Sequence, residues 1–268
     1  MKSVIHPTAV VSQKAELAAD VEIGPYTLVG PHAKIGAGTR IGSHVVIEGR
    51  VRIGKRCRIF TGACLGFPAQ TLGPKEADAS VEIGDDNILR EYVTVNAAMK
   101  DAGRTVIGHR NMLMINAHIA HDCVLGNDIV IANNVALAGH VTVEDRAVLG
   151  GLVGVHQFAR IGKLAMVGGL SKVVMDIAPF SLNDGRPAAF CGLNAIGLRR
   201  AGLRPAQITP IKAALKLLFG HKQNLKNILP KVKKQFAESQ EVQYLLSFIE
   251  TSKRGVTRVS GSHSGFDG

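Results

Sequence analysis

Four histidines lie close together in the sequence and could carry out proton transfer. They are His118, His121, His140 and His156, and Asp122 follows His121 directly. A histidine has an unperturbed pKa of about 6.5, so at neutral pH it can remove a proton from a hydroxyl group. A neighbouring carboxylate can fix the tautomer of the ring and stabilise the imidazolium that forms. These residue types therefore indicate general base catalysis.

The elements that must hold these residues are short strands, because an apolar residue recurs at every sixth position over most of residues 1–183. The first run begins Ile5, Val11, Leu17 and Ile23, and glycine often follows such a residue directly. Hexapeptide periodicity is typical of a parallel β-helix, in which three hexads make one coil of about 18 residues. The sequence therefore predicts an all-β solenoid over residues 1–183, with an apolar interior.

A coil of about 18 residues places side chains in columns along the edges of the solenoid. His121, Gly139 and Gln157 fall in one column, while Asp122 and His140 fall in the next. Because coils stack at about 4.8 Å, the cluster should occupy a strip of about 10–14 Å. A third column beside these two contains Ala120, Ala138 and His156. We therefore expect a single site assembled from three successive coils.

Acyl transfer from a thioester to an alcohol is the chemistry that this arrangement suits best. One histidine would remove the proton of the alcohol. Gly139 would leave its backbone N–H open to the developing oxyanion. A nucleophilic thiol is disfavoured, because Cys123 occupies an inward position of its hexad.

Two other classes of function remain open from these residues. The γ-class carbonic anhydrases are β-helices that bind zinc through three histidines, and His118, His121 and His140 would supply enough nitrogen ligands. That interpretation gives Asp122 no role. A non-catalytic scaffold is the other alternative, and it would not need His121, Gly139 and Gln157 in one column.

Two segments break the hexapeptide period. They are residues 66–82 and residues 96–106, and the second is rich in Ala, Lys, Asp and Gly. A solenoid accommodates insertions as loops that leave it at one corner, and such loops commonly carry functional residues. We therefore expect both segments to be inserted loops.

The apolar spacing changes from about residue 200 onward. Ile211, Leu215 and Leu218 have helical spacing, and two further runs of this kind follow. The sequence thus predicts a small C-terminal domain of three amphipathic α-helices over residues 184–258. The Ser- and Gly-rich residues 259–268 are expected to be a disordered tail.

The C-terminal segment carries most of the positive charge. The chain has a formal net charge of +11, and residues 199–258 hold 13 Lys and Arg against three Glu, which gives +10. Such a segment favours an acidic or polyanionic partner. No recognised nucleic-acid motif accompanies the charge, so we do not expect nucleic acid to be the partner.

Composition also bears on the compartment. No apolar run is long enough for a transmembrane helix, and the hexapeptide repeat begins at once, so we expect neither a membrane span nor a signal peptide. The four cysteines include no CxxC pair and are expected to be reduced thiols. Together these features predict a cytoplasmic protein.

Four motifs carry a resemblance to a known family: Asn116-Ala117-His118-Ile119-Ala120-His121-Asp122-Cys123, Leu137-Ala138-Gly139-His140, Val155-His156-Gln157-Phe158 and Asn194-Ala195-Ile196-Gly197-Leu198-Arg199-Arg200. They resemble those of the UDP-N-acetylglucosamine O-acyltransferases, the first enzymes of lipid A biosynthesis, and the resemblance covers nearly the whole chain. It implies a left-handed β-helix, a homotrimer with active sites between adjacent subunits, and no metal or other cofactor. It also implies transfer of a 3-hydroxyacyl chain from acyl carrier protein to the 3-hydroxyl of UDP-N-acetylglucosamine.

The resemblance assigns a role to each matching residue. It implies that His121 is the general base, that Asp122 orients it and that Gly139 supplies the oxyanion N–H. Gly169 matches the position that measures acyl length, and without a side chain it should leave the pocket long. The substrate-binding residues would be Gln70, His118, His140, His156 and Gln157, with Asn194 and Arg200 on the nucleotide. Because acyl carrier protein is acidic, we expect it to dock on Arg199, Arg204 and Lys212.

The chain departs from the family pattern on the sugar side. Gln70-Thr71-Leu72-Gly73 stands where members often have Gln-Asp-Leu-Lys, and Ile196 and Ala201 replace a Glu and an Arg found in some. One hypothesis is therefore that the acceptor is a 3-amino UDP-sugar, which would be N-acylated. The later N-acyltransferase of the pathway normally has an extra N-terminal domain, and a repeat that begins at Ile5 argues against it.

Overall fold

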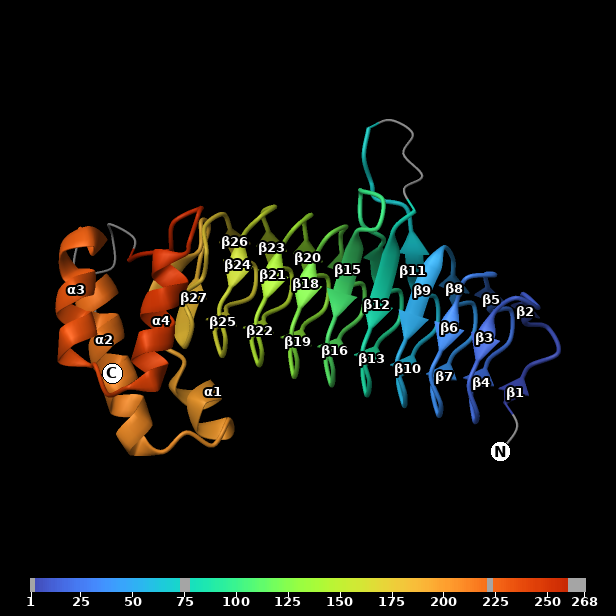
Figure 1. Ribbon diagram of the computed structural model, residues 1–268, viewed down its shortest axis with the longest axis horizontal. Coiled ribbons are helices and arrows are strands. Elements are labelled where there is room, and N and C mark those ends of the chain that lie inside the picture. Colours follow the sequence, from blue (N-terminus) through green and yellow to red (C-terminus); the bar gives the residue numbers. More distant parts are fainter. Residues whose placement is uncertain (1–2, 73–77, 221–223, 260–268) are drawn as a thin grey trace.

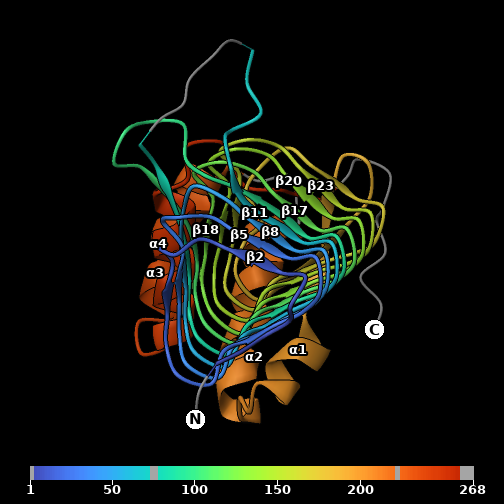
Figure 2. The ribbon, with the colours of Figure 1, turned by 90° about the vertical axis from the view of Figure 1, so that its right-hand side faces the viewer.

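The computed structural model describes residues 3–72, 78–220 and 224–259, and these form a left-handed parallel β-helix followed by helices. Figure 1 shows the coils stacked along the long axis, with the helices at the end opposite the N-terminus. Figure 2 looks along the solenoid and shows that the two inserted segments leave it on the same side. The predicted fold class is confirmed. The expected tail, residues 259–268, lies outside the described residues except for residue 259.

Three parallel sheets form the walls of the solenoid. The first runs β1 (Val4–Ile5), β4 (Glu22–Ile23), β7 (Arg40–Ile41), β10 (Arg58–Ile59), β13 (Ile88–Leu89), β16 (Met112–Leu113), β19 (Val130–Ile131), β22 (Val148–Leu149), β25 (Met166–Val167) and β27 (Ser181–Asp184), and ends with the antiparallel β28 (Ala189–Leu193). The second runs β2 (Val10–Val11), β5 (Leu28–Val29), β8 (Val46–Ile47), β11 (Cys64–Phe67), β14 (Thr94–Asn96), β17 (His118–Ile119), β20 (Ala136–Leu137), β23 (Gly154–Val155) and β26 (Lys172–Val173). The third runs β3 (Glu16–Leu17), β6 (Lys34–Ile35), β9 (Arg50–Ile53), β12 (Ser80–Ile83), β15 (Arg104–Ile107), β18 (Val124–Leu125), β21 (Thr142–Val143) and β24 (Arg160–Ile161).

Each strand alternates one inward and one outward side chain, and the inward residues of successive coils build the core. Ile119 pairs with Leu137, and Leu137 pairs with Val155, so three apolar side chains stack in one column. All three are buried. Burial of apolar surface in such ladders stabilises the solenoid, and each coil relies on its neighbours for that burial.

The insertions lengthen two coils without breaking the ladder. Ile59 pairs with Leu89, and Leu89 pairs with Leu113, so the sheet passes directly across both interruptions. The flanking strands β11 and β12 reach into the range 66–82, and β14 and β15 reach into the range 96–106. The described residues between these strands therefore lie outside the regular coils, and a solenoid accommodates insertions in this way.

Four helices follow the last strand within the described part of the chain, one more than the apolar spacing predicted. They are α1 (Ala195–Arg200), α2 (Pro205–Phe219), α3 (Leu225–Gln235) and α4 (Gln240–Glu250). The short α1 was not expected from periodicity, because its six residues are too few to display one. None of these helices combines the length and apolar composition that crossing a bilayer requires.

The helices are fixed to the end of the solenoid by a buried carboxylate. Asp176 accepts hydrogen bonds from the Arg160 backbone N–H at 2.8 Å and from the Ser252 hydroxyl at 2.7 Å. A second apolar core, which includes Phe219 and Phe248, lies among the helices. A buried charge needs such partners, because leaving it unpaired is costly. This second core also includes Leu164, Ala178 and Phe180 from the last coils of the solenoid, so it extends across the boundary that we place near residue 183.

Candidate active site

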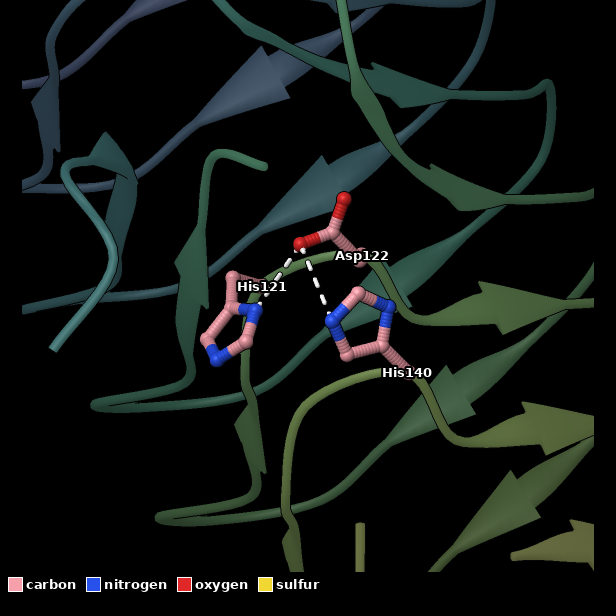
Figure 3. Close-up of side chains that lie close together, drawn as sticks. All are labelled: His121, Asp122 and His140. Carbon is pink, nitrogen blue, oxygen red and sulfur yellow. Dashed lines mark hydrogen bonds and ion pairs between the residues drawn. The ribbon is translucent and has the colours of Figure 1, made fainter. Parts of the chain in front are cut away.

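His121, Asp122 and His140 converge at one corner of the solenoid (Figure 3). His121 Nδ1 lies 2.8 Å from Asp122 Oδ2, and His140 Nε2 lies 3.7 Å from the same oxygen. The side chains of His121 and Asp122 retain only 15% and 17% of their exposure, so water screens their interaction weakly. The two predicted columns thus meet at a carboxylate that lies between two imidazole rings.

The turns of three successive coils set the positions of these side chains. Asp122, His140 and Phe158 all have left-handed backbone conformations, with φ of 60°, 60° and 65°. Asp and His adopt this conformation more readily than most residues other than glycine. The rings of His140 and Phe158 stack, with centroids 4.6 Å apart. This stacking limits the freedom of the His140 ring and holds its Nε2 toward Asp122.

The second insertion holds Asp122 in place. The Met99 backbone N–H donates to Asp122 Oδ2 at 3.1 Å, and the Asp122 backbone N–H donates to Thr105 Oγ1 at 2.9 Å. An ionised carboxylate accepts such hydrogen bonds strongly. The Asp122 carboxylate oxygen is therefore held in a position where it can accept a hydrogen bond from the Nδ1–H of His121. A His121 ring that carries its proton on Nδ1 keeps a lone pair on Nε2.

Gly139 lies directly against the His121 ring. A Cβ added to Gly139 would lie 2.3 Å from His121 Cε1 and 2.5 Å from Nε2, so any side chain here would displace the imidazole. The Gly139 backbone N–H has no acceptor among the residues that the structure describes. The column predicted from the period is therefore present, and an open N–H lies next to the ring.

His118 occupies the outward position of β17 and is held by Thr94. The two residues are directly paired in the sheet, and Thr94 Oγ1 lies 2.7 Å from His118 Nδ1. Burial, and to a smaller extent the charge of His121, lower the pKa of His118 below its ordinary value. His118 is therefore neutral at pH 7 and can donate or accept a hydrogen bond without adding charge.

A groove of ≈ 510 Å³ runs along the outer face of the second sheet beside this cluster. Its lining combines backbone atoms and small side chains with a few polar groups, a composition that is typical of substrate-binding sites. Five of the residues predicted for the site line this groove: Gln70, His118, His121, Gly139 and His156. His156 Nδ1 donates to the Gln157 carbonyl at 3.1 Å, whereas the exposed Gln157 side chain does not line the groove.

Three other predicted residues lie away from this groove in the single chain. Gly169 lies beside Gly151 on a different corner, and Arg200 is exposed at the end of α1. Asn194 is the N-cap of α1, where its Oδ1 accepts from the Gly197 N–H at 3.1 Å and its Nδ2 donates to the Leu164 carbonyl at 2.9 Å. One chain therefore does not bring these three residues to His121.

A second cavity, of ≈ 820 Å³, lies between β28 and the helices α1 and α2. Arg199 and Lys212 line it, and Lys216 is a third cation in its lining, which contains no carboxylate. Arg204 is exposed at the N-terminus of α2, just outside the lining. The residues predicted to dock an acidic protein thus gather around one end of the helical domain.

The carbonic anhydrase alternative requires a zinc site made of three histidines. One ligand atom each from His121, Asp122 and His140 lie within 4.8 Å of one another. His118 does not belong to this group, and its Nδ1 is already hydrogen-bonded to Thr94. The three histidines that a carbonic anhydrase site would need are therefore not gathered. The residues fit a hydrogen-bonded histidine and carboxylate pair better than a three-histidine zinc site.

Cys123 is excluded as a nucleophile by its surroundings. Its side chain is fully buried inside the solenoid. Burial raises the pKa of the Cys123 thiol to about 12, so the reactive thiolate is absent at neutral pH.

Comparison with known proteins now decides the family. The chain is 46% identical over 255 residues to the acyl-[acyl-carrier-protein]--UDP-N-acetylglucosamine O-acyltransferase of Thiobacillus denitrificans, which covers 95% of this chain and 99% of that protein. It belongs to the UDP-N-acetylglucosamine O-acyltransferase family. The family described as Udp N-acetylglucosamine O-acyltransferase, domain 2, matches residues 176–257, and six bacterial transferase hexapeptide repeats match residues 104–139.

Solved structures of this family agree with the architecture. The acyltransferase LpxA from Acinetobacter baumannii superposes with a TM-score of 0.91 at 39% identity, covering 95% of this chain and 100% of that one. The UDP-N-acetylglucosamine acyltransferase from Bacteroides fragilis gives a TM-score of 0.92 at 35% identity, with coverage of 95% and 100%. The chain is therefore an acyltransferase. The carbonic anhydrase, scaffold and 3-amino sugar alternatives gain no support from these relatives.

Four contributors to the site were missed by sequence reasoning. The residues concerned are Thr94, Met99, Thr105 and Lys172, the last of which lines the groove on β26. Thr94, Met99 and Thr105 precede or lie within the second insertion, so the 18-residue spacing does not relate them to the histidines. Lys172 does follow His118 at three such spacings, and that relation could have identified it.

Replacing Gly139 tests the contact with His121. Because the new Cβ would overlap the imidazole, we expect Gly139→Ala to lower kcat for acyl transfer about 100-fold, with little change in Tm. The matched control is Gly151→Ala, whose Cβ would meet only the Asn133 carbonyl, at 3.5 Å. Steady-state kinetics and thermal unfolding of both variants provide the measurement. Equal kcat values for the two variants would contradict the prediction.

Proposed function

We propose that this acyltransferase moves a 3-hydroxyacyl chain from acyl carrier protein to the 3-hydroxyl of UDP-N-acetylglucosamine, the first step of lipid A biosynthesis. The observation that carries the proposal is the pairing of His121 Nδ1 with Asp122 Oδ2 at 2.8 Å, in a histidine whose ring lines the groove. The relatives are named as acyltransferases that use acyl carrier protein and UDP-N-acetylglucosamine, which supports this donor and this acceptor. The hydroxyl acceptor is preferred to a 3-amino sugar on the same ground.

His121 is the general base of the proposed reaction. Its Nε2 removes the proton of the sugar 3-hydroxyl while the oxygen attacks the thioester carbonyl carbon. Asp122 keeps the proton of the ring on Nδ1 and stabilises the imidazolium. The Gly139 N–H donates to the oxyanion of the tetrahedral intermediate. When the intermediate collapses, the C–S bond breaks and the leaving thiolate takes the proton from His121.

Replacing the base tests this mechanism. We expect His121→Ala to lower kcat by about 10²–10⁴-fold, because proton removal is lost while binding of the sugar is largely kept. Asp122→Asn should also lower kcat, since an amide cannot stabilise the imidazolium. Purified protein is assayed with 3-hydroxyacyl carrier protein and UDP-N-acetylglucosamine. Full activity of His121→Ala would reject the assignment, and an inactive wild-type protein would reject the proposed reaction.

Assembly as a homotrimer belongs to the same proposal. Gly169, Asn194 and Arg200 lie away from the groove of their own chain, so a second copy is needed if they are to reach the substrate at His121. An apolar stripe on the outer face of the first sheet offers a surface for association, and it contains Ile88, Met112, Val130, Val148 and Met166.

The mass in solution tests this assembly. Sedimentation equilibrium should return three times the mass of one chain. Mixing inactive His121→Ala chains with inactive Arg200→Ala chains should restore part of the activity, because some sites then combine one intact residue from each chain. A monomer that retains activity would contradict the proposal.

Acyl carrier protein docks, in this proposal, on the basic end of the helical domain. The supporting observation is the group of cations at the cavity between β28 and α2, which includes Arg199 and Lys212, with Arg204 beside it. An acidic partner is attracted over a distance that salt shortens. The proposed reaction takes place in the cytoplasm. None of the four described cysteines forms a disulfide, which is consistent with a reducing compartment.

Charge reversal tests the docking surface. We expect Arg199→Glu combined with Lys212→Glu to raise KM for acyl carrier protein about tenfold, without a matching change in KM for the sugar nucleotide. Lys14→Glu, on an exposed side chain at the other end of the solenoid, is the control for net charge. Raising the ionic strength should increase KM for the native protein and reduce the difference between variants. An unchanged KM in the double variant would place the docking surface elsewhere.

A further inference from the structure

Lys172 occupies the end of the groove nearest the helical domain. It is the outward residue of β26, the last strand of the second sheet, and β26 lies beside the helical end in Figure 1. On the outer face of the sheet, His118 pairs with Ala136, Ala136 pairs with Gly154, and Gly154 pairs with Lys172. His118 and Lys172 therefore mark two ends of one column, about 14 Å apart at the usual spacing of strands.

Small residues make this column a trough. Ala136 and Gly154 lie between the histidine and the lysine, and a Cβ added to Gly154 would have no atom within 4 Å. Val174 and His156 border the same groove. An extended chain can therefore lie against the sheet between Lys172 and the histidines without meeting a large side chain.

The Lys172 ammonium is available to a ligand. Within the described residues it makes no hydrogen bond or ion pair, and the lining of the groove contains no carboxylate that could neutralise it. Its backbone is fixed, because its N–H donates to the Gly185 carbonyl and its carbonyl accepts from the Ala188 N–H. An unpaired cation on a fixed strand, beside a groove, is suited to binding a phosphate.

We propose that Lys172 binds the phosphate of the phosphopantetheine arm that carries the acyl group of the donor. The inference rests on the proposed function, which supplies an acyl carrier protein as donor. In the proposed trimer, a carrier docked on the helical domain of a neighbouring chain would pass its arm over β26 before the thioester reaches His121. The phosphate then pairs with Lys172, and the extended arm lies over Gly154 and Ala136.

Two thioesters that differ only in the phosphate test this assignment: 3-hydroxyacyl-phosphopantetheine and 3-hydroxyacyl-pantetheine. We expect wild-type protein to prefer the phosphorylated donor about tenfold in kcat/KM, and Lys172→Met to reduce this preference to about onefold. The same variant should raise KM for acyl carrier protein, while Lys172→Arg retains most of the preference. Lys163→Met is the matched control, because Lys163 is an exposed lysine in the same coil but outside the groove.

The outcomes separate this inference from the function on which it rests. Turnover of acyl carrier protein by wild-type protein is measured first, and its absence would overturn both. If wild-type protein is active and Lys172→Met keeps the preference for the phosphorylated donor, the inference alone fails. A raised KM for UDP-N-acetylglucosamine with an unchanged donor preference would assign Lys172 to the diphosphate of the acceptor and overturn the donor assignment. Unchanged thermal unfolding of Lys172→Met excludes a folding defect.

Discussion

Backbone pairing between successive coils governs the position of every group in the site. In the second sheet, β14, β17, β20 and β23 each pair in parallel with the strand one coil further along, so a residue in one coil lies directly over its partner in the next. Inward and outward residues alternate along these strands. Ile119 therefore extends the core while its neighbour His118 opens onto the groove. Packing of the interior thus fixes the geometry of the outer surface, because both belong to the same strands.

This rigid pairing also explains how short turns hold the groups that we propose to be catalytic. The Gly139 backbone approaches the His121 ring because the next coil must lie one strand spacing away. The second insertion adds what the coil itself lacks, a backbone N–H from Met99 that reaches the Asp122 carboxylate. Functional groups supported by a regular scaffold and a neighbouring loop need little reorganisation during reaction, and that preorganisation lowers the barrier.

The distribution of charge along the solenoid suits the two anionic substrates of the proposed reaction. The groove lining lacks carboxylates, and Asp122 lies behind His121 and His140. The cations lie further along, at Lys172 and then in the helical domain. In the proposed reaction, the histidines transfer the proton, whereas the lysines and arginines bind the anionic groups of the substrates. A permanently charged lysine in place of His121 would bind an anion but could not act as a base at neutral pH.

The sequence alone determined the coil and the columns of side chains. An apolar residue at every sixth position over this length predicts a β-helix. The 18-residue coil then places His121 over Gly139 and Asp122 over His140. The tertiary structure decided the rest. Thr94 and Met99 reach the site only after the second insertion is folded back against the solenoid, and no fixed spacing encodes that path. Asn194 illustrates the same limit, because its capping of α1 depends on where the solenoid ends and the helices pack. Local periodicity can be recognised from the sequence, whereas contacts across an insertion or between two cores depend on how those parts pack in three dimensions.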